Sequence, residues 1–435
     1  MGRSELSVLI VGSGGREHAL AEQVKRSRRV GRLLCAPGNA GIAQIAECLP
    51  VEATDIDGLL AVAQQQQVDL TIVGPEAPLC AGIVDRFEAA GLRIFGPSAA
   101  AARLEGDKAF AKRLMHRCNV PTAEGRTFER FRDAKTYIAT RDTPQVVKAV
   151  GLAAGKGVVV CDDPADALIA AERMMEGGQF GDAGRRIVVE EKLEGPELSV
   201  LALVDGQTLY VLESAQDHKR LGDGDTGPNT GGMGAFSPPP IATPAVLATI
   251  EHDVLVPIID CLRSEGITYR GVLYAGLMLT GAGPKVLEFN CRFGDPETQA
   301  VLPRLRTDLI DVIEATIDGT LDRVDLDWDP RAAVTVVLAS AGYPGDYARG
   351  KPITGLTEAV AQPDVQIYHA GTSRVGDQFV TNGGRVLSVS ALGPDVSSAR
   401  ERVYAAVERI HFAGVQFRQD IALGGDARAG IARSR

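Results

Sequence analysis

The first hundred residues alternate between short runs of branched apolar residues and amphipathic segments. The runs are SVLIVG, RLLCAPG, DLTIVGPE and LRIFGP, and the helical pattern follows from about Arg16, at 57–66 and at 81–90. Strands that alternate with helices pair in parallel, and continuously apolar strands are covered on both faces. The pattern therefore predicts a doubly wound α/β domain whose ligand crevice lies beyond the carboxyl ends of its strands.

The turn after the first strand, GSGGREH, begins like a dinucleotide-binding loop, with Gly12 and Gly14. Glu17 stands where that loop needs its third glycine, and no acidic residue ends the second strand to bind a ribose. NAD binding is therefore not expected. Two interpretations stay open: a glycine turn whose helix amides bind a phosphate, or a tight turn in which residues 16–18 form a solvated first helical turn.

The composition indicates an ordinary globular protein, with 435 residues, 45% hydrophobic and 23% charged. The formal charge of -10 argues against general binding of nucleic acid. No apolar run resembles a signal peptide or reaches membrane-spanning length, so we expect a cytoplasmic protein without membrane contacts. The seven cysteines are scattered without a C-x-x-C pair, which indicates neither a zinc site nor a disulfide framework.

The stretch VVKAVGLAAGKGVVV, residues 146–160, places lysines and glycines between two β-branched runs. A P-loop needs four residues between its glycines and a Ser or Thr after its lysine. Here three residues separate Gly151 from Gly155, and Gly157 follows Lys156. The stretch is therefore not a P-loop, and two strands joined by a glycine loop instead suggest a lid.

The segments that follow carry clustered charge. The strand RIVVEE ends at Glu190 and Glu191, which a solvated strand end would also explain. Residues 213–240 are too long and too glycine-rich for an ordinary connection, and such loops are functional or disordered. Because Asp217 and Lys219 lie within a DHKR cluster there, we expect a loop that covers the substrate.

A hairpin turned at 281–284 follows a helix at 244–264. In its second strand Glu288 and Asn290 are two apart, so their oxygens project from the same face. Such oxygens suit Mg²⁺ held through one or two protein ligands plus nucleotide phosphates, although polar residues on a strand need no metal. Three further charges in CRFGDPE, from Arg292, Asp295 and Glu297, favour the site.

From Ala332 the chain reads as a small α+β cap with strands AAVTVVLAS, VQIYHAG and RVLSVSALG and a helix near 396–409. Beyond about Ala422 the sequence has little to bury and is expected to fray. We therefore divide the chain into an N-terminal domain at 1–104, a central domain at 105–326, a C-terminal domain at 327–425 and a disordered tail at 426–435.

The order of the motifs resembles that of the phosphoribosylamine-glycine ligases, also called glycinamide ribonucleotide synthetases. The resemblance covers residues 6–421 and rests on these segments: GSGGREHAL, APGNAG, VGPEAPL, LEGDKAF, KAVGLAAGKGV, SAQDHKR, DGDTGPNTGGMGA, LEFNCRFGDPETQ and TNGGRVL. RFGDPETQ together with DHKR and TGGMGA is specific to that family, whereas GLAAGKG or GSGG alone is not.

The resemblance implies an ATP-grasp fold, in which ATP lies between two lobes and a mobile lid lobe, here about 121–192, closes on its phosphates. It also implies ATP-dependent ligation of glycine to 5-phosphoribosylamine through glycyl phosphate, giving glycinamide ribonucleotide in purine synthesis. Mg²⁺ is the expected metal, with Mn²⁺ as an alternative, and the expected assembly is a monomer or a weak homodimer. Two other readings stay open: another ATP-grasp ligase or carboxylase, and a nucleotide-binding regulator without turnover.

The resemblance also implies site residues. Those expected to bind ATP are Lys108, Lys148, Gly151, Gly155, Lys156, Gly157, Glu190, Glu191, Leu193 and, at the ribose, Glu197. Those expected to face glycine or phosphoribosylamine are Gly14, Gly15, Arg16, Glu17, His18, Asn39, Glu76, Asp217, Asp295 and Glu297. The expected catalytic cations are Lys219, Arg220 and Arg292, and the expected metal ligands are Glu288 and Asn290.

Two positions depart from the family pattern. Val150 replaces an acidic or small polar residue before the lid loop, which puts a polar contact there in doubt. The C-terminal R-x-D-I-G segment reads RQDIAL, so Ala422 replaces a glycine, with an expected effect on packing alone.

Overall fold

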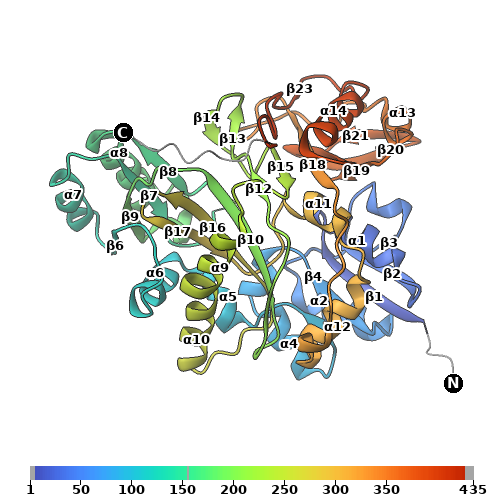
Figure 1. Cartoon of the computed structure of the whole chain (residues 1–435), viewed down its shortest axis with the longest axis horizontal. Coiled ribbons are helices and arrows are strands. Elements are labelled where there is room, and N and C mark those ends of the chain that lie inside the picture. The colour runs from blue at the N-terminus through green and yellow to red at the C-terminus, as the bar shows by residue number, and fades with distance from the viewer. Residues whose placement is uncertain (1–4, 154–155, 427–435) are drawn as a thin grey trace.

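The computed structural model describes residues 5–153 and 156–426. Figure 1 shows the N-terminal sheet on one side of the molecule, a small lobe that contains α7 and α8 on the opposite side, and the C-terminal domain above the N-terminal sheet. Within the described residues, no helix combines the length and the apolar character needed to cross a bilayer.

The N-terminal domain is the expected doubly wound sheet. Its strands are β1 (Leu6–Gly12), β2 (Val30–Pro37), β3 (Glu47–Cys48), β4 (Leu70–Val73) and β5 (Ile94–Phe95), all parallel in the order β3-β2-β1-β4-β5. Its helices are α1 (Gly15–Arg26), η1 (Ile42–Gln44), α2 (Ile56–Gln65), α3 (Glu76–Cys80), α4 (Ile83–Ala89) and α5 (Ala99–Gly106). Along β1, Leu9 and Val11 join one buried cluster and Val8 and Ile10 another, so both faces are covered.

The central domain has two lobes with separate sheets. The lid lobe has β6 (Gly125–Phe128), α7 (Phe131–Ala139), β7 (Gln145–Ala149), β8 (Val158–Cys161), α8 (Pro164–Met175), η2 (Gly181–Gly184) and β9 (Ile187–Glu191), with strand order β6-β9-β7-β8. Its own core packs Val147, Ile187 and Val189 against α7 and α8. The predicted lid loop follows β7 and precedes β8 in the chain.

The second lobe is built on an antiparallel sheet of order β11-β10-β16-β17. Its strands are β10 (Glu197–Val204), β11 (Leu209–Val211), β16 (Gly271–Thr280) and β17 (Gly283–Asn290). Its helices are α6 (Lys108–Arg117), α9 (Pro244–Ile250), the π-helical turn η3 (Glu251–Leu255), α10 (Val256–Ser264), α11 (Thr298–Val301), η4 (Leu302–Arg304), α12 (Leu309–Asp318) and η5 (Leu321–Arg323). In Figure 1 this sheet lies between the lid lobe and the N-terminal domain.

The C-terminal domain is the expected α+β unit. Its elements are β18 (Ala332–Ser340), α13 (Leu356–Val360), β19 (Val365–His369), β20 (Thr372–Val375), β21 (Gln378–Thr381), β22 (Arg385–Gly393), α14 (Val396–Val407) and β23 (Val415–Gln416). Helix α14 packs on β18 and β22, whose apolar residues form the domain core.

The segment 213–240 is not the irregular loop that its composition suggested. It contains β12 (Gln216–Asp217), β13 (Arg220–Gly222), β14 (Thr226–Asn229) and β15 (Gly234–Ser237). Strands β12 and β15 extend the C-terminal sheet in the order β12-β15-β18-β22-β19, while β13 and β14 form a hairpin. Within the segment only β15 pairs with β18, from Gly234 opposite Val336 to Ser237 opposite Ala333, and β12 in turn pairs with β15.

The end of the described chain is also more ordered than expected. Ala422 is buried, and the Asp426 carboxylate accepts hydrogen bonds from the amides of Val396 and Ser397 at 3.0 and 2.9 Å. Asp426 thereby caps the start of α14, so fraying from Ala422 was a wrong expectation. The rest of the predicted disordered tail, residues 427–435, lies outside the described residues.

The cysteine prediction was wrong for one pair. Cys118, at the end of α6, forms a disulfide with Cys261 of α10, with their Cα atoms 6.2 Å apart. The two residues are 143 positions apart in sequence, so only the packing of α6 on α10 brings them together. A spacing pattern cannot reveal such a pair.

Candidate active site

Two lysines from different lobes lie close enough for their charges to interact. The Lys148 ammonium, on β7, donates to the Leu287 carbonyl of β17 at 2.9 Å. Lys108, the first residue of α6, donates to the Gly151 carbonyl at 3.4 Å. Burial, together with the charge of Lys148, lowers the pKa of Lys108 even though Glu288 lies close enough to oppose the shift. An anion between the two ammonium groups would relieve this repulsion.

Glu190 lies between two lysines and is not a solvated strand end. Its two carboxylate oxygens lie 2.6 Å from the Lys112 ammonium and 2.7 Å from the Lys148 ammonium, and the residue is 5% exposed. Burial favours a raised pKa, but Lys148 and Lys112 outweigh it and lower the pKa of Glu190. The carboxylate is therefore ionised and bound within the protein.

The neighbouring charge, Glu191, fits the solvated interpretation better. It is exposed, pairs with Lys285 at 2.9 Å and accepts from the amide of Glu124 at 2.9 Å. Leu193 follows two residues after the end of β9, in the connection to the second lobe.

The lid loop combines a fixed glycine with an exposed lysine. A Cβ at Gly151 would lie 2.8 Å from Ala183 of η2, so only glycine fits between the two segments. Lys156 is exposed and lines a cavity of about 530 Å³ with Asn229 and Tyr343. Gly157 packs close to Ala149, and the predicted Gly155 lies outside the described residues.

Val150 has no polar side chain, and its polar contacts are made by its main chain. Its side chain is 3% exposed, its carbonyl accepts from the Lys108 amide at 3.0 Å, and its amide donates to the Arg186 carbonyl at 3.0 Å. The valine therefore joins the start of α6 to the lid lobe through its backbone.

The predicted metal ligands share one face of β17 with a lysine from the β12–β13 connection. Lys219 lies 3.7 Å from the Glu288 carboxylate and 3.2 Å from that of Glu197. Burial would raise the pKa of Glu288, but Lys219, Lys108 and other cations lower it. Glu197, expected at the ribose, thus pairs with the catalytic candidate Lys219.

Arg292 is held from several sides. Its guanidinium lies 2.9 Å from Glu105 of α5 and 3.4 Å from Glu76 of α3, and it donates to the Asn290 side-chain oxygen at 3.3 Å. Burial opposes its charge, but the carboxylates of Glu105 and Glu76 raise its pKa. Arg220 lies apart from this group, because its guanidinium donates to the Gly227 carbonyl within the β13–β14 hairpin.

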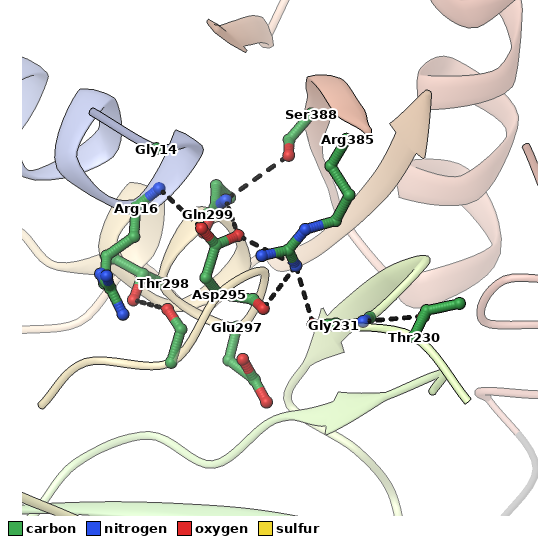
Figure 2. Close-up of polar contacts among 12 residues, drawn as sticks. Gly14, Arg16, Thr230, Gly231, Asp295, Glu297, Thr298, Gln299, Arg385 and Ser388 are labelled. Carbon is green, nitrogen blue, oxygen red and sulfur yellow. Dashed lines mark hydrogen bonds and ion pairs between the residues drawn. The ribbon is translucent and has the colours of Figure 1, made fainter. Parts of the chain in front are cut away.

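Asp295 sits where three domains meet, as Figure 2 shows. One of its carboxylate oxygens accepts from the Arg16 amide at 3.5 Å, and the other accepts from the Gln299 side chain at 2.9 Å. Arg385 of β22 donates to the backbone carbonyls of Asp295 and Gly231, each at 2.7 Å. Burial favours a raised pKa for Asp295, yet Arg385 and Arg16 lower it.

The GGREH turn is neither solvated nor open. The Gly14 amide donates to the Glu17 carboxylate at 2.5 Å, which also lies 2.5 Å from the Arg16 guanidinium. His18 accepts from the His369 amide at 2.7 Å, and residues 15–18 are all buried. Two internal carboxylates, from Glu17 and Asp295, therefore face amides at the start of α1 where a phosphate was expected.

The remaining predicted substrate residues divide into two sets. Asn39 donates to the carbonyls of Ser13 and His369 at 2.8 and 2.7 Å, which connects the N-terminal and C-terminal domains. Asp217 and Glu297 lie at the two ends of a buried hydrogen-bonded series that also contains Ser199 and Tyr274, with spacings of 3.2, 3.0 and 2.9 Å. Burial, with the charges of Glu297 and Glu197, raises the pKa of Asp217 to about 7, although Lys219 opposes the shift.

Four further residues belong to this arrangement and were not predicted: Glu105, Lys112, Gln299 and Arg385. Lys112 could have been found, because it lies four residues after Lys108 on the same helix face. Gln299 and Arg385 lie inside the quoted motifs RFGDPETQ and TNGGRVL, but only the folded chain shows that they meet.

Comparisons with known proteins agree over most of the chain. Residues 6–105, 106–298 and 333–424 match, respectively, the N domain, the ATP-grasp (A) domain and the C domain of phosphoribosylglycinamide synthetase. Phosphoribosylamine–glycine ligase of Rhodopirellula baltica is 51% identical, over 96% of this chain and 97% of its own. That of Vibrio cholerae is 50% identical, over 97% of this chain and 99% of its own.

Solved structures are similar over the same extent. The phosphoribosylamine–glycine ligase of Thermotoga maritima superposes with a TM-score of 0.84 at 33% identity, covering 96% of this chain and all of that one. The biotin carboxylase domain of Hydrogenobacter thermophilus 2-oxoglutarate carboxylase, solved with MgADP and bicarbonate, has a TM-score of 0.73 at 15% identity, covering 95% and 92%. The second similarity concerns the fold alone.

Proposed function

The chain belongs to the phosphoribosylglycinamide synthetase family, and on that basis we propose how its residues divide the work of the reaction. It is an ATP-dependent carbon–nitrogen ligase that joins glycine to 5-phosphoribosylamine, giving glycinamide ribonucleotide in purine biosynthesis. The observation that supports the division best is that Lys148, Lys219 and Arg292 surround Glu288 and Asn290 between the lobes.

ATP first has to activate the glycine carboxylate, because an amine does not attack a carboxylate directly. We place the triphosphate between Lys108 and Lys148 and beneath the lid residues Gly151, Lys156 and Gly157. The γ-phosphoryl group then moves to the carboxylate to form glycyl phosphate. Such transfers depend on alignment and on neutralising charge, so the protein needs no covalent nucleophile.

Glu288 and Asn290 fit a magnesium ion. They present a carboxylate and an amide oxygen on one face of β17, and cations keep Glu288 ionised. Among residues 5–153 and 156–426, no cluster of three or more His, Cys, Asp or Glu side chains could hold a metal alone. Mg²⁺ commonly takes one or two protein oxygens plus phosphates, and Mn²⁺ accepts the same donors. When bound, the ion would supply positive charge to the phosphate oxygens.

Lys219 and Arg292 are the proposed cations for the acyl-transfer half of the reaction. Glu197 and Glu288 hold Lys219, while Glu76 and Glu105 hold Arg292, so neither cation has to reorganise as charge develops. Of the three proposed catalytic residues, Arg220 has the least structural support, because its guanidinium donates to the Gly227 carbonyl of its own hairpin. The lid excludes water while the amine attacks, which protects the acyl phosphate from hydrolysis.

Phosphoribosylamine is proposed to lie on the side of Asp295, Glu297 and Arg385, facing the N-terminal domain. Because the side chains of residues 16–18 contact the protein, we assign to the substrate only the edge formed by the exposed Ser13 and the half-buried Gly14. Asp217 and Glu297 are kept as proposed substrate residues, and Asn39 acts through its contact with the turn.

The finer biological assignments are also proposals. We propose the domain division at 1–104, 105–326 and 327–425, a monomer or weak homodimer, and a cytoplasmic location. Stable disulfides are rare in cytosolic proteins, so the Cys118–Cys261 bond is evidence against a cytoplasmic location. Counting free thiols in denatured, unreduced protein purified from cytoplasm tests the conflict directly.

The activity test follows ADP and phosphate release in a coupled assay. ATP cleavage should require both glycine and freshly made phosphoribosylamine, and glycinamide ribonucleotide should form in equal amount. Equal ADP formation without either substrate would indicate another ATP-dependent enzyme. No ADP with both substrates would indicate a nucleotide-binding protein without turnover, and either result overturns the ligase assignment.

A further inference from the structure

Lys112 is a buried lysine with no hydrogen left for a ligand. It lies on α6, its side chain is 6% exposed, and its ammonium donates to the Thr122 hydroxyl at 3.0 Å and to the Ala123 carbonyl at 2.8 Å. The third partner is the Glu190 carboxylate at 2.6 Å. Because an ammonium group has three donors, Lys112 has none left for a phosphate and can act on a ligand only through its partners.

The partner that leads to the site is Glu190. Its other oxygen lies 2.7 Å from the Lys148 ammonium, which also donates to the Leu287 carbonyl at 2.9 Å. These contacts run from α6 through β9 and β7 to β17, so they join both lobes. Lys148 has two of its three donors engaged, which leaves one for a ligand in the cleft.

The charges show what Lys112 contributes. With Lys112 present, one carboxylate is shared between two ammonium groups, and the trio carries a net positive charge. Without Lys112, the carboxylate would pair with Lys148 alone and neutralise it. A triphosphate in the cleft would then meet a neutral pair instead of a cation, in surroundings where charges are weakly screened.

We propose that Lys112 is a positioning residue for the nucleotide, which shares Glu190 and so leaves the Lys148 charge available to the phosphates. The proposal rests on the proposed contact between Lys148 and ATP. A purely structural role, in which the trio only ties α6 to the lid lobe, predicts lost stability without a specific change in nucleotide affinity.

The test measures binding of ATP with Mg²⁺ by calorimetry, without turnover. Lys112→Met should weaken binding about tenfold, which corresponds to about 1.4 kcal/mol. The double variant Lys112→Met/Glu190→Gln should recover most of that loss, because removing the carboxylate frees Lys148 again. Lys135→Met, which removes an exposed charge from α7 of the same lobe, should bind ATP as the unmodified chain does.

The possible results separate the two ideas. If Lys148→Met binds ATP like the unmodified chain, the proposed ATP contact is wrong. If Lys148→Met binds weakly but Lys112→Met stays within twofold, or if the double variant recovers nothing, the role of Lys112 alone is wrong. Thermal unfolding checks that each variant folds. If Lys112→Met does not fold, Lys112→Gln replaces it, because glutamine retains a hydrogen-bond donor for the Ala123 carbonyl.

Discussion

Ala422 occupies a backbone conformation that favours glycine. Its φ is 58°, its side chain is 3% exposed, and its amide donates to His218 at 3.3 Å. A β-carbon is unfavourable in this left-handed region, although it does bury a methyl group here. Ala422→Gly should therefore raise the free energy of unfolding by about 0.5 kcal/mol.

Chemical denaturation measures the change in Ala422→Gly against a matched control. Ala361 lies at the end of α13 with φ -71°, where alanine is not strained, so Ala361→Gly should lower stability by roughly 0.5 kcal/mol. Equal destabilisation by both substitutions would show that the buried methyl group outweighs the backbone conformation at position 422.

Substitution of Glu288 tests the proposed metal site. Glu288→Gln keeps the shape of the side chain but removes its charge, so turnover should fall about 100-fold, or roughly 3 kcal/mol in activation free energy. Thermal stability should change little, because Glu288 is partly exposed and its nearest cation, Lys219, keeps the Glu197 contact. Glu251→Gln, an exposed carboxylate on η3, is the control, and an unchanged rate for Glu288→Gln would place the metal elsewhere.

At the scale of elements, the β13–β14 hairpin depends on one buried arginine. Arg418, 1% exposed in its side chain, lies 2.7 Å from both Asp225 and Asp420 and donates to the Arg220 carbonyl at 3.2 Å. Asp225 is largely exposed, so losing the arginine would not strand a buried charge there. Arg418→Met should cost about 2 kcal/mol and loosen the hairpin that precedes the GGMGA motif.

Hydrogen exchange reports this effect where it should occur. Amides within 220–229 should exchange faster in Arg418→Met, while those of β10 and β16 should not change. Arg374→Met, which removes an exposed arginine paired with Asp377 at 3.2 Å, should alter stability by less than about 0.5 kcal/mol. Unchanged exchange in the hairpin would mean that its own backbone pairing suffices.

Elements that form from local pattern were predictable, and elements that form from distant pairing were not. Strands β1, β2, β4 and β5 of the N-terminal sheet and the 271–290 hairpin have long apolar or alternating runs, and their positions were correct to within a few residues. Strands β3 and β12 have two residues each and exist only because β2 and β15 pair with them. The four strands in 213–240 were not predicted for the same reason: the local sequence is rich in glycine and charge, and the strands form through their pairing partners.

The site divides in the same way. Glu288 and Asn290 were predictable because two residues on one strand face share a direction. Glu105 and Arg385 were not predicted, since each acts on a residue far away in sequence: Arg292 and Asp295, respectively. For Lys112 the spacing from Lys108 offered a signal, but its contact with Glu190 depends on the fold. The contacts of Arg16 with the Phe293 carbonyl and of His18 with the His369 amide likewise come from the packing of three domains around one turn. Glu17 pairs within the turn itself, with Gly14 and Arg16.

At the scale of the whole molecule, three histidines lie where the C-terminal domain meets the rest: His18 and His369 are buried and His218 is half-buried. His18 of α1 accepts from the His369 amide of β19, and His218 accepts from the Ala422 amide. Burial, the first cause in each case, lowers the pKa of His18 to about 3 and those of His218 and His369 to about 4. Protonating any of them would place a charge in these contacts.

The sign of the pH dependence follows from these shifts. A histidine whose folded pKa lies below its usual 6.5 stabilises the fold fully above that value, and the contribution is lost as the pH falls toward the folded pKa. Each of the three can cost up to about 1.4 kcal/mol per pH unit in that range. Asp217 has the opposite effect. Its folded pKa of about 7 lies above its usual value, so as the pH falls the folded chain takes up this proton before the unfolded chain does, and the free energy of unfolding rises.

We therefore expect the free energy of unfolding to fall between pH 6.5 and 5, because the three histidines lower it and the carboxyl groups with a raised pKa, Asp217 among them, offset only part of the loss. Denaturation at several pH values measures the slope, and His18→Gln should reduce it by up to about 1.4 kcal/mol per pH unit. His252→Gln, at a histidine whose side chain is 88% exposed, should leave the slope unchanged. An unaltered slope in His18→Gln would contradict the assignment, because the protons taken up on unfolding would then bind to groups other than His18.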